Sequence, residues 1–296
     1  MTGAASSAGK NAAHPTPRNT ELELKLLVDP ADLARLIDAP LIATLARNNG
    51  QVRHLTSTYY DTAAGTLAEA GISFRIRGIG RRFIATVKRA PLPGAHALTR
   101  GEWEAPATGM TADPSSLLWQ LPDDIRALFD GVVLEPLFRT LVHRRTRRLN
   151  VSGADLEIAF DQGTIEAGQR TQPISEIELE LKRGDQAALF EVAVRLAEIA
   201  PLRPSLSSKA ERGAALARNR PPAARRAPRI QLQAGLSLDD AFRMIFRSIF
   251  AHLLCNQAAA EDMRDPEGVH QLRIALRRLR AALALVAPLG PTPTLD

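Results

Sequence analysis

The sequence predicts an α+β fold in which an antiparallel β-sheet forms the N-terminal part and helices form the remainder. Apolar and charged residues alternate over many short segments, as in strands with one polar face. Two such segments, Ile72–Arg77 and Arg82–Arg89, flank a turn at Gly78–Gly80, which is typical of a β-hairpin. After a stretch rich in proline and arginine, the pattern becomes purely helical.

Composition and charge limit the classes of partner. The 296 residues suggest about two domains, and a net charge of +6 favours an anionic partner. The single cysteine, Cys255, excludes an intramolecular disulfide and a cysteine-based zinc site, and it fits a reducing, cytoplasmic compartment. No apolar run is long enough to cross a bilayer, and no nucleic-acid-binding signature is present. We therefore expect neither a membrane nor a nucleic acid as partner.

Four regions are expected along the chain. Residues 1–18 read as a disordered leader, 19–218 as the β-rich domain, 219–235 as a linker whose arginines are solubilising, and 236–296 as a partial helical domain. Two helices, from Ser237 to about Met263 and from Pro266 to about Ala287, cannot bury their apolar stripes well alone. The helical domain therefore looks incomplete.

The expected elements of the β-rich domain follow from the spacing of apolar residues and from the proline and glycine residues that begin or end an element. Alternating or β-branched segments predict strands at 20–28, 53–62, 72–77, 82–89, 98–105, 134–149, 155–161 and 174–182. Apolar spacing, with Pro30 at one start and Gly71 and Gly184 as breaks, predicts helices at 30–37, 66–70, 113–129, 186–200 and 207–217. Gln162–Gly163 is expected to be a turn.

The charged faces of these strands are the main functional signal. In a strand at 20–28, Glu21, Glu23 and Lys25 share one face, and leucines occupy the other. The segment 174–182 repeats this arrangement with three glutamates and a lysine. Such a face is either solvated, as on an open sheet, or it lines the inside of a barrel, where the charges converge. The pattern alone leaves both possibilities open.

The barrel alternative has definite chemical consequences. A cavity lined by arginine and lysine suits a polyanion, whereas clustered carboxylates repel one another unless a cation lies between them. Mg²⁺ or Mn²⁺ would fit, because hard cations take oxygen ligands and share them with phosphates. In the arginine-rich strand, Arg139, Arg145 and Arg147 share one parity and are expected to face inward, with Arg144 and Arg148 facing outward.

Eight ordered motifs carry a family resemblance: Glu21-Leu-Glu-Leu-Lys25, Tyr59-Tyr-Asp-Thr62, Phe74-Arg-Ile-Arg77, Thr86-Val-Lys88, Arg100-Gly-Glu-Trp-Glu104, Asp161-x-Gly163, Glu176-Ile-Glu-Leu-Glu-Leu-Lys182 and Ser208-Lys-x-Glu-Arg-Gly213. In this order they resemble the CYTH family, the triphosphate tunnel metalloenzymes, over roughly 19–218. The segment Val269–Arg280 resembles the start of a CHAD domain, a helical module associated with polyphosphate binding. Its basic stripe, from His270 to Arg280, is either a solvated face or a polyphosphate surface.

The resemblance implies an antiparallel β-barrel tunnel with peripheral helices and a set of site residues. The implied ligands of Mg²⁺ or Mn²⁺ are Glu21, Glu23, Glu176, Glu178, Glu180 and Asp161. The implied phosphate-binding residues are Lys25, Arg75, Arg77, Lys88, Arg139, Arg145 and Lys209, of which the first four are also assigned to catalysis. Tyr59 and Tyr60 are expected to be packing residues.

The resemblance also implies an activity, the metal-dependent hydrolysis of inorganic triphosphate to pyrophosphate and phosphate. Two alternatives remain: another triphosphate-processing CYTH activity (a nucleoside or thiamine triphosphatase, or an adenylyl cyclase), and a non-catalytic polyphosphate-binding protein. The carboxylates argue against the second alternative, because a pure polyanion binder gains nothing from acids in its groove.

Overall fold

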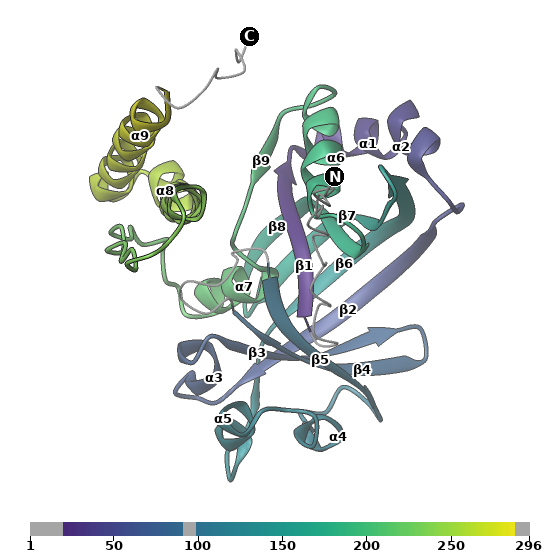
Figure 1. The fold of residues 1–296 in the computed structure, drawn as a ribbon. Coiled ribbons are helices and arrows are strands. Elements are labelled where there is room, and N and C mark those ends of the chain that lie inside the picture. Colours follow the sequence, from purple (N-terminus) through teal and green to yellow (C-terminus); the bar gives the residue numbers. More distant parts are fainter. Residues whose placement is uncertain (1–19, 91–98, 288–296) are drawn as a thin grey trace, which may run out of the picture.

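The computed structural model describes residues 20–90 and 99–287, in which an antiparallel sheet of nine strands is the largest unit (Figure 1). The order of the strands in the sheet is β5-β4-β3-β2-β6-β7-β8-β1-β9. Their bounds are β1 Thr20–Val28, β2 Gln51–Asp61, β3 Ile72–Ile79, β4 Arg82–Arg89, β5 Thr99–Ala107, β6 Glu135–Val151, β7 Ala154–Ala167, β8 Arg170–Arg183 and β9 Leu202–Pro204.

The sheet curls until strands from its two ends meet. β1 pairs with β8 from Glu23 onward, and the beginning of β1 pairs with β5 through Thr20, Glu21 and Leu22. This second pairing is short, so the sheet forms a tunnel whose seam is joined over only a few residues. The predicted antiparallel tunnel with peripheral helices is confirmed in this form.

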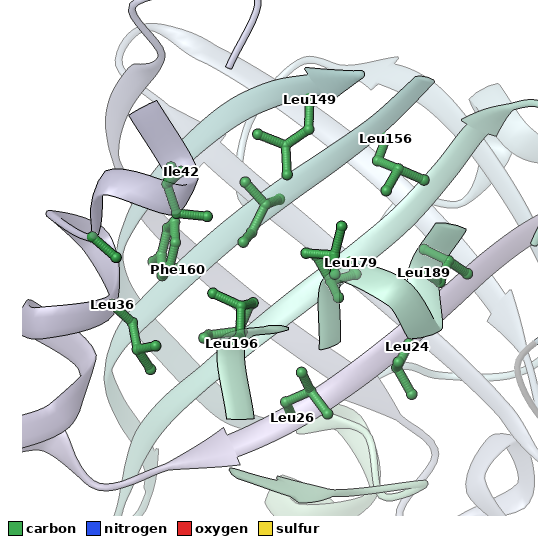
Figure 2. Close-up of a cluster of buried hydrophobic side chains, with 14 of the residues drawn as sticks. Leu24, Leu26, Leu36, Ile42, Leu149, Leu156, Phe160, Leu179, Leu189 and Leu196 are labelled. Carbon is green, nitrogen blue, oxygen red and sulfur yellow. The ribbon is translucent and has the colours of Figure 1, made fainter. Parts of the chain in front are cut away.

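One outer face of the sheet is covered by three helices: α1 Pro30–Ile37, α2 Pro40–Leu45 and α6 Ala187–Ala197. Figure 2 shows the buried layer between these helices and the sheet. In it, Leu24 and Leu26 of β1 and Leu179 of β8 meet Leu189 and Leu196 of α6. Fully burying one such side chain contributes about 1.5–3 kcal/mol. The leucine face of β1 therefore points outward, into this layer, and its charged face points into the tunnel.

A second layer covers β3, β4 and β5 on the outside. Phe74 and Trp103 pack there against α3 Thr66–Glu69 and short helical pieces, namely α4 Ser115–Leu118, α5 Asp123–Arg126 and the 3₁₀ turn Ala127–Phe129. The expected continuous helix at 113–129 is wrong. Pro122 directly precedes α5, and proline cannot continue a preceding helix because it lacks an N–H and clashes with the turn before it.

Helix α7, Lys209–Ala217, packs on the inner side of the sheet, where Ala210 and Ala214 meet Phe138 of β6. Gly213 allows this approach, because a Cβ at that position would lie 2.1 Å from the Phe138 ring. An apolar cluster thus fills one part of the tunnel interior, and α7 is held against it.

The long strands correct two further expectations. β7 continues through Gln162 and Gly163, so the predicted turn there is wrong. A Cβ on Gly163 would lie 1.9 Å from the Leu141 carbonyl oxygen, which shows that this glycine serves close contact between β7 and β6. The strands β6 to β8 are also longer than predicted, and α2 and the short β9 had no recognised signal.

The C-terminal region consists of two helices, as expected: α8 Leu238–Asp262 and α9 Pro266–Val286, which pack on each other (Figure 1). Ser237 caps α8 by accepting a hydrogen bond from the Asp240 N–H, and Asp265 caps α9 in the same way through the Glu267 N–H. Within the described residues, no helix has the length and apolar character needed to span a membrane.

Candidate active site

The tunnel contains a cavity of about 620 Å³, and about half of the residues that line it are charged. Because alternate residues of each strand face inward, β1, β3, β4, β5 and β8 each contribute charges to it. The inward-facing charged residues include Glu21, Glu23, Lys25, Arg75, Arg77, Lys88, Glu102, Glu104, Arg144, Glu178, Glu180 and Lys209. Segments far apart in the sequence thus converge on one polar interior.

The wall formed by β1 and β8 holds the acid-rich motifs side by side. Glu23 lies directly opposite Glu180 in the register, and Lys25 lies opposite Glu178. The Lys25 Nζ is buried, 3.3 Å from a Glu23 oxygen and 3.5 Å from a Glu178 oxygen. The two ends of the β-rich domain therefore build one cluster of carboxylates around a lysine.

Helix α7 supplies a second buried lysine. Ser208 and Glu211 form a capping box, in which Ser208 Oγ accepts from the Glu211 N–H and the Glu211 carboxylate accepts from the Ser208 N–H. This cap fixes the first turn, from which Lys209 reaches Asp161 at 2.6 Å, Glu178 at 2.8 Å and also Glu176. Burial alone would lower the pKa of Lys209, but the three carboxylates outweigh it and raise that pKa.

Arg144 of β6 completes this cluster. Its guanidinium donates to both oxygens of Asp161, at 2.7 and 2.6 Å, and to Glu178 at 2.5 Å. Burial would raise the pKa values of Asp161 and Glu178, yet Lys209 and Arg144 hold both below their usual range, Glu178 most strongly. Bidentate pairing of this kind fixes geometry as well as charge.

The opposite wall, formed by β3, β4 and β5, carries paired charges of its own. Lys88 Nζ lies 2.6 Å from Glu21 and 3.2 Å from Glu102, and these acids raise its pKa against the lowering effect of burial. Arg75 lies 3.8 Å from Glu102 and 3.9 Å from Glu104, and it donates to the Tyr59 hydroxyl at 3.4 Å. Tyr59 packs on Phe138, as expected, and also presents its hydroxyl to the cavity.

Arg77 differs from these residues. It donates to the Ser57 hydroxyl at 3.1 Å, and no carboxylate of the described residues lies within ion-pair distance of it. Burial lowers the pKa of Arg77 to about 10, and the neighbouring guanidinium groups of Arg75 and Arg144 act in the same direction. A largely buried positive charge without an acidic partner is costly, so Arg77 is suited to meet an anion that enters the tunnel.

The carboxylates fall into two groups as possible metal ligands. Oxygen atoms of Asp161, Glu176 and Glu178 lie within 4.8 Å of one another, but buried cations already hold them; Glu176 is paired with Lys209 and Arg212. Glu21, Glu23 and Glu180 are less compensated. Burial raises the pKa of Glu180 to about 7, and the nearby Glu21 and Glu157 add to the rise although Lys182 opposes it. Glu21, Glu23 and Glu180 each line the cavity and each have a single lysine partner among the described residues, so a free oxygen of each could serve a hard divalent cation.

The structure brings together most of the predicted site residues but not two arginines. Arg139 and Arg145 lie on the outer face of β6, where Arg139 is exposed and paired with Glu166 at 2.6 Å. Arg144, predicted to face outward, points inward with Phe138 and Val142. The parity was misassigned because charge was expected inside, whereas the interior side of β6 is partly apolar where α7 packs.

Arg212 is a further residue that the sequence did not single out. Its guanidinium donates to Glu176 from the same turn of α7 that presents Lys209. It lies in the motif Ser208–Gly213, and its position three residues after Lys209 places both side chains on one helix face; these two signals could have identified it.

The architecture is that of an antiparallel tunnel with a basic and acidic interior. A family comparison matches residues 19–214 to the CYTH domain and residues 244–296 to the CHAD domain. The chain belongs to the CYTH family. This agrees with the resemblance carried by the eight motifs.

Two kinds of relative were found. The inorganic triphosphatase of Haemophilus influenzae is 32% identical over 201 residues, which cover 65% of this chain and 54% of the relative. The chain thus spans about half the length of this curated relative. Among solved structures, a Hippeastrum adenylyl cyclase candidate with a dominant triphosphatase activity is 20% identical, with a TM-score of 0.45, and covers 64% of this chain and 92% of that one.

A Mimivirus capping enzyme triphosphatase is 11% identical, has a TM-score of 0.38, and covers 61% of this chain and 90% of that one. At such TM-scores these structural likenesses support no inference about the function of this chain.

Proposed function

We propose that this protein hydrolyses inorganic triphosphate to pyrophosphate and phosphate inside the tunnel, with Mg²⁺ or Mn²⁺ as cofactor. The observation that carries the proposal is the convergence of lysines, arginines and carboxylates on one cavity, with Arg77 left without an acidic partner. A polyanion would supply the negative charge that Arg77 lacks. A divalent cation would supply further positive charge to Glu21, Glu23 and Glu180. The similarity to an inorganic triphosphatase supports the same substrate class.

Glu21, Glu23 and Glu180 would hold the cation. Glu178 lies next to Lys25, so Lys25 could pair with Glu178 when Glu23 binds the cation. A bound divalent cation would neutralise phosphate charge and lower the pKa of a water molecule that it binds. Asp161 and Glu176, both fully buried and held by arginine and lysine, would instead fix Lys209 and Arg144 in place.

The basic side chains would bind and orient the phosphates. One side of the substrate would meet Arg75 and Arg77 of β3 and Lys88 of β4, which is paired with β3. The other side would meet Lys25 and Lys209. Phosphoryl transfer depends mainly on positioning and on stabilising charge in the transition state, and donors fixed by buried partners need little reorganisation to do so. The predicted catalytic set Lys25, Arg75, Arg77 and Lys88 is retained in this proposal.

The test compares inward-facing and outward-facing charges. Glu23→Gln and Lys88→Ala should each lower triphosphate turnover about a hundred- to a thousandfold, because each removes a charged group from the tunnel. Arg139→Ala and Arg145→Ala, on the outer face of the same sheet, should keep nearly wild-type turnover. Circular dichroism should show the same fold in all four variants. Near wild-type turnover in Glu23→Gln and Lys88→Ala would contradict the proposal.

A further inference from the structure

The segment that joins α7 to α8 is fixed at one residue, Arg225. The Arg225 N–H donates to Asn256 Oδ1 at 2.7 Å, and the Arg225 carbonyl accepts from Asn256 Nδ2 at 2.8 Å and from His252 Nε2 at 3.1 Å. Asn256 is fully buried and His252 nearly so. Two buried polar side chains of α8 thus bind the backbone of a single residue, which fixes the linker at that point.

His252 is itself held by α9. Its Nε2 also bonds Gln271 Oε1 at 2.9 Å, and its Nδ1 accepts from Arg278 Nη1 at 3.4 Å. These contacts fit the neutral ring with its proton on Nε2. The position of the Arg225 backbone is therefore set by both C-terminal helices.

Arg225 is one of the residues that line the tunnel cavity. Ala251 and Cys255 of α8 and Glu211 and Ala214 of α7 line the same region. The guanidinium lies near the Cys255 thiol, whose pKa burial raises and Arg225 partly lowers. Arg225 is exposed whereas Arg77 and Lys88 are largely buried, so the segment held by the C-terminal helices adds a positive charge on the solvent-facing side of the same cavity.

Arg225 shares one property with Arg77. The other basic residues that line the cavity each have a carboxylate partner: Lys25, Arg75, Lys88, Arg89, Arg144, Lys182 and Lys209. Within residues 20–90 and 99–287, no ion pair involves Arg77 or Arg225. The cavity therefore has two uncompensated cations, one deep among the strands and one contributed by the helical region.

We propose that Arg225 is an outer phosphate-binding residue that lets the tunnel accept linear polyphosphates longer than triphosphate. The inference rests on the proposed function. Cavities of about 300–1,000 Å³ usually hold drug-sized ligands, so a volume of about 620 Å³ leaves room beyond three phosphates. A chain whose inner phosphates meet Arg77 would present its outer phosphate to Arg225, and a guanidinium binds phosphate oxygens in a bidentate manner.

The test measures kcat/KM for tetraphosphate and for triphosphate at low salt. Arg225→Ala should lower the tetraphosphate value about three- to tenfold relative to the triphosphate value, the modest size reflecting an exposed contact. Arg225→Lys should recover part of this loss, and the effect should shrink at high salt. Arg229→Ala removes the same charge from an exposed linker position outside the cavity wall and should leave the ratio unchanged.

Two further measurements separate this inference from the proposed function. Calorimetry of tetraphosphate binding in EDTA needs no turnover, so it tests Arg225→Ala against Arg229→Ala even if triphosphate is not a substrate. Asn256→Ala, checked for folding by circular dichroism, should release the backbone and reduce tetraphosphate selectivity in the same way. Equal behaviour of Arg225→Ala and Arg229→Ala, or equal losses with both substrates in Arg225→Ala, would overturn the inference.

Discussion

Replacing Arg77 by methionine should stabilise the ligand-free protein while it removes activity. One pKa unit corresponds to about 1.4 kcal/mol, so an arginine whose pKa is lowered to about 10 carries a folding penalty of about 3 kcal/mol. The penalty is fully present at pH 7, because pH 7 lies below both the folded and the unfolded pKa, and it is lost only as the pH rises above 10.

Arg77→Met keeps most of the side-chain volume but loses the hydrogen bond to Ser57, which contributes about 1 kcal/mol. We therefore expect the free energy of unfolding to rise by about 1–2 kcal/mol in urea denaturation with EDTA and no phosphate. Triphosphate turnover should fall about a hundred- to a thousandfold, because the uncompensated charge no longer meets the substrate.

Arg75→Met is the matched control for this variant. Arg75 lies two residues away on the same face of β3, but it is paired with Tyr59, Glu102 and Glu104, which raise its pKa. Its loss should lower the free energy of unfolding by about 1–3 kcal/mol, because the buried Tyr59 hydroxyl loses its donor and the half-buried Glu102 loses one of its two cations. Stability changes of the same sign in both variants, or wild-type turnover in Arg77→Met, would refute the reasoning.

Three further outcomes are expected. Lys209→Met should lower the free energy of unfolding by about 3–5 kcal/mol in urea, since it leaves Asp161, Glu176 and Glu178 short of one cation; a loss below about 1 kcal/mol would count against that cluster. Gly213→Ala should cost about 1–3 kcal/mol by pushing α7 away from Phe138, and Phe138→Leu should recover part of it; a neutral Gly213→Ala would contradict this packing. In metal-free protein, the raised pKa of Glu180 should make stability fall as the pH rises from about 4.5 to about 7, because the folded state then binds more protons, and Glu180→Gln should flatten this slope; an unchanged slope would reject the shift.

The sequence predicted the tunnel walls where one face of a strand is uniformly apolar. Alternation put Leu22, Leu24 and Leu26 on one face and Glu21 and Glu23 on the other, and likewise in β8, but it left open whether the charged face meets solvent or a tunnel. The family resemblance favoured the tunnel, and the helices that cover the leucine face are consistent with it. A glycine in the sequence can indicate either a turn or a close contact between strands. Gly163 was predicted to lie in a turn, but it allows close contact between β7 and β6.

Other features depend on contacts that the sequence does not encode locally. The parity of Arg144 follows from α7 filling part of the tunnel, which places apolar Phe138 and Val142 on the interior side of β6. The lack of a partner for Arg77 becomes visible only when every neighbouring strand is in place. The fixed position of Arg225 depends on His252 and Asn256, which follow it by 27 and 31 residues in the sequence.

Phosphate release from inorganic triphosphate, ATP and thiamine triphosphate, each with Mg²⁺, Mn²⁺ or EDTA, tests the central claim most directly. We expect one pyrophosphate and one phosphate per inorganic triphosphate in the presence of either metal, no turnover in EDTA, and little release from the two organic substrates. Turnover that survives EDTA would contradict the role given to Glu21, Glu23 and Glu180, and a preference for ATP or thiamine triphosphate would contradict the proposed substrate.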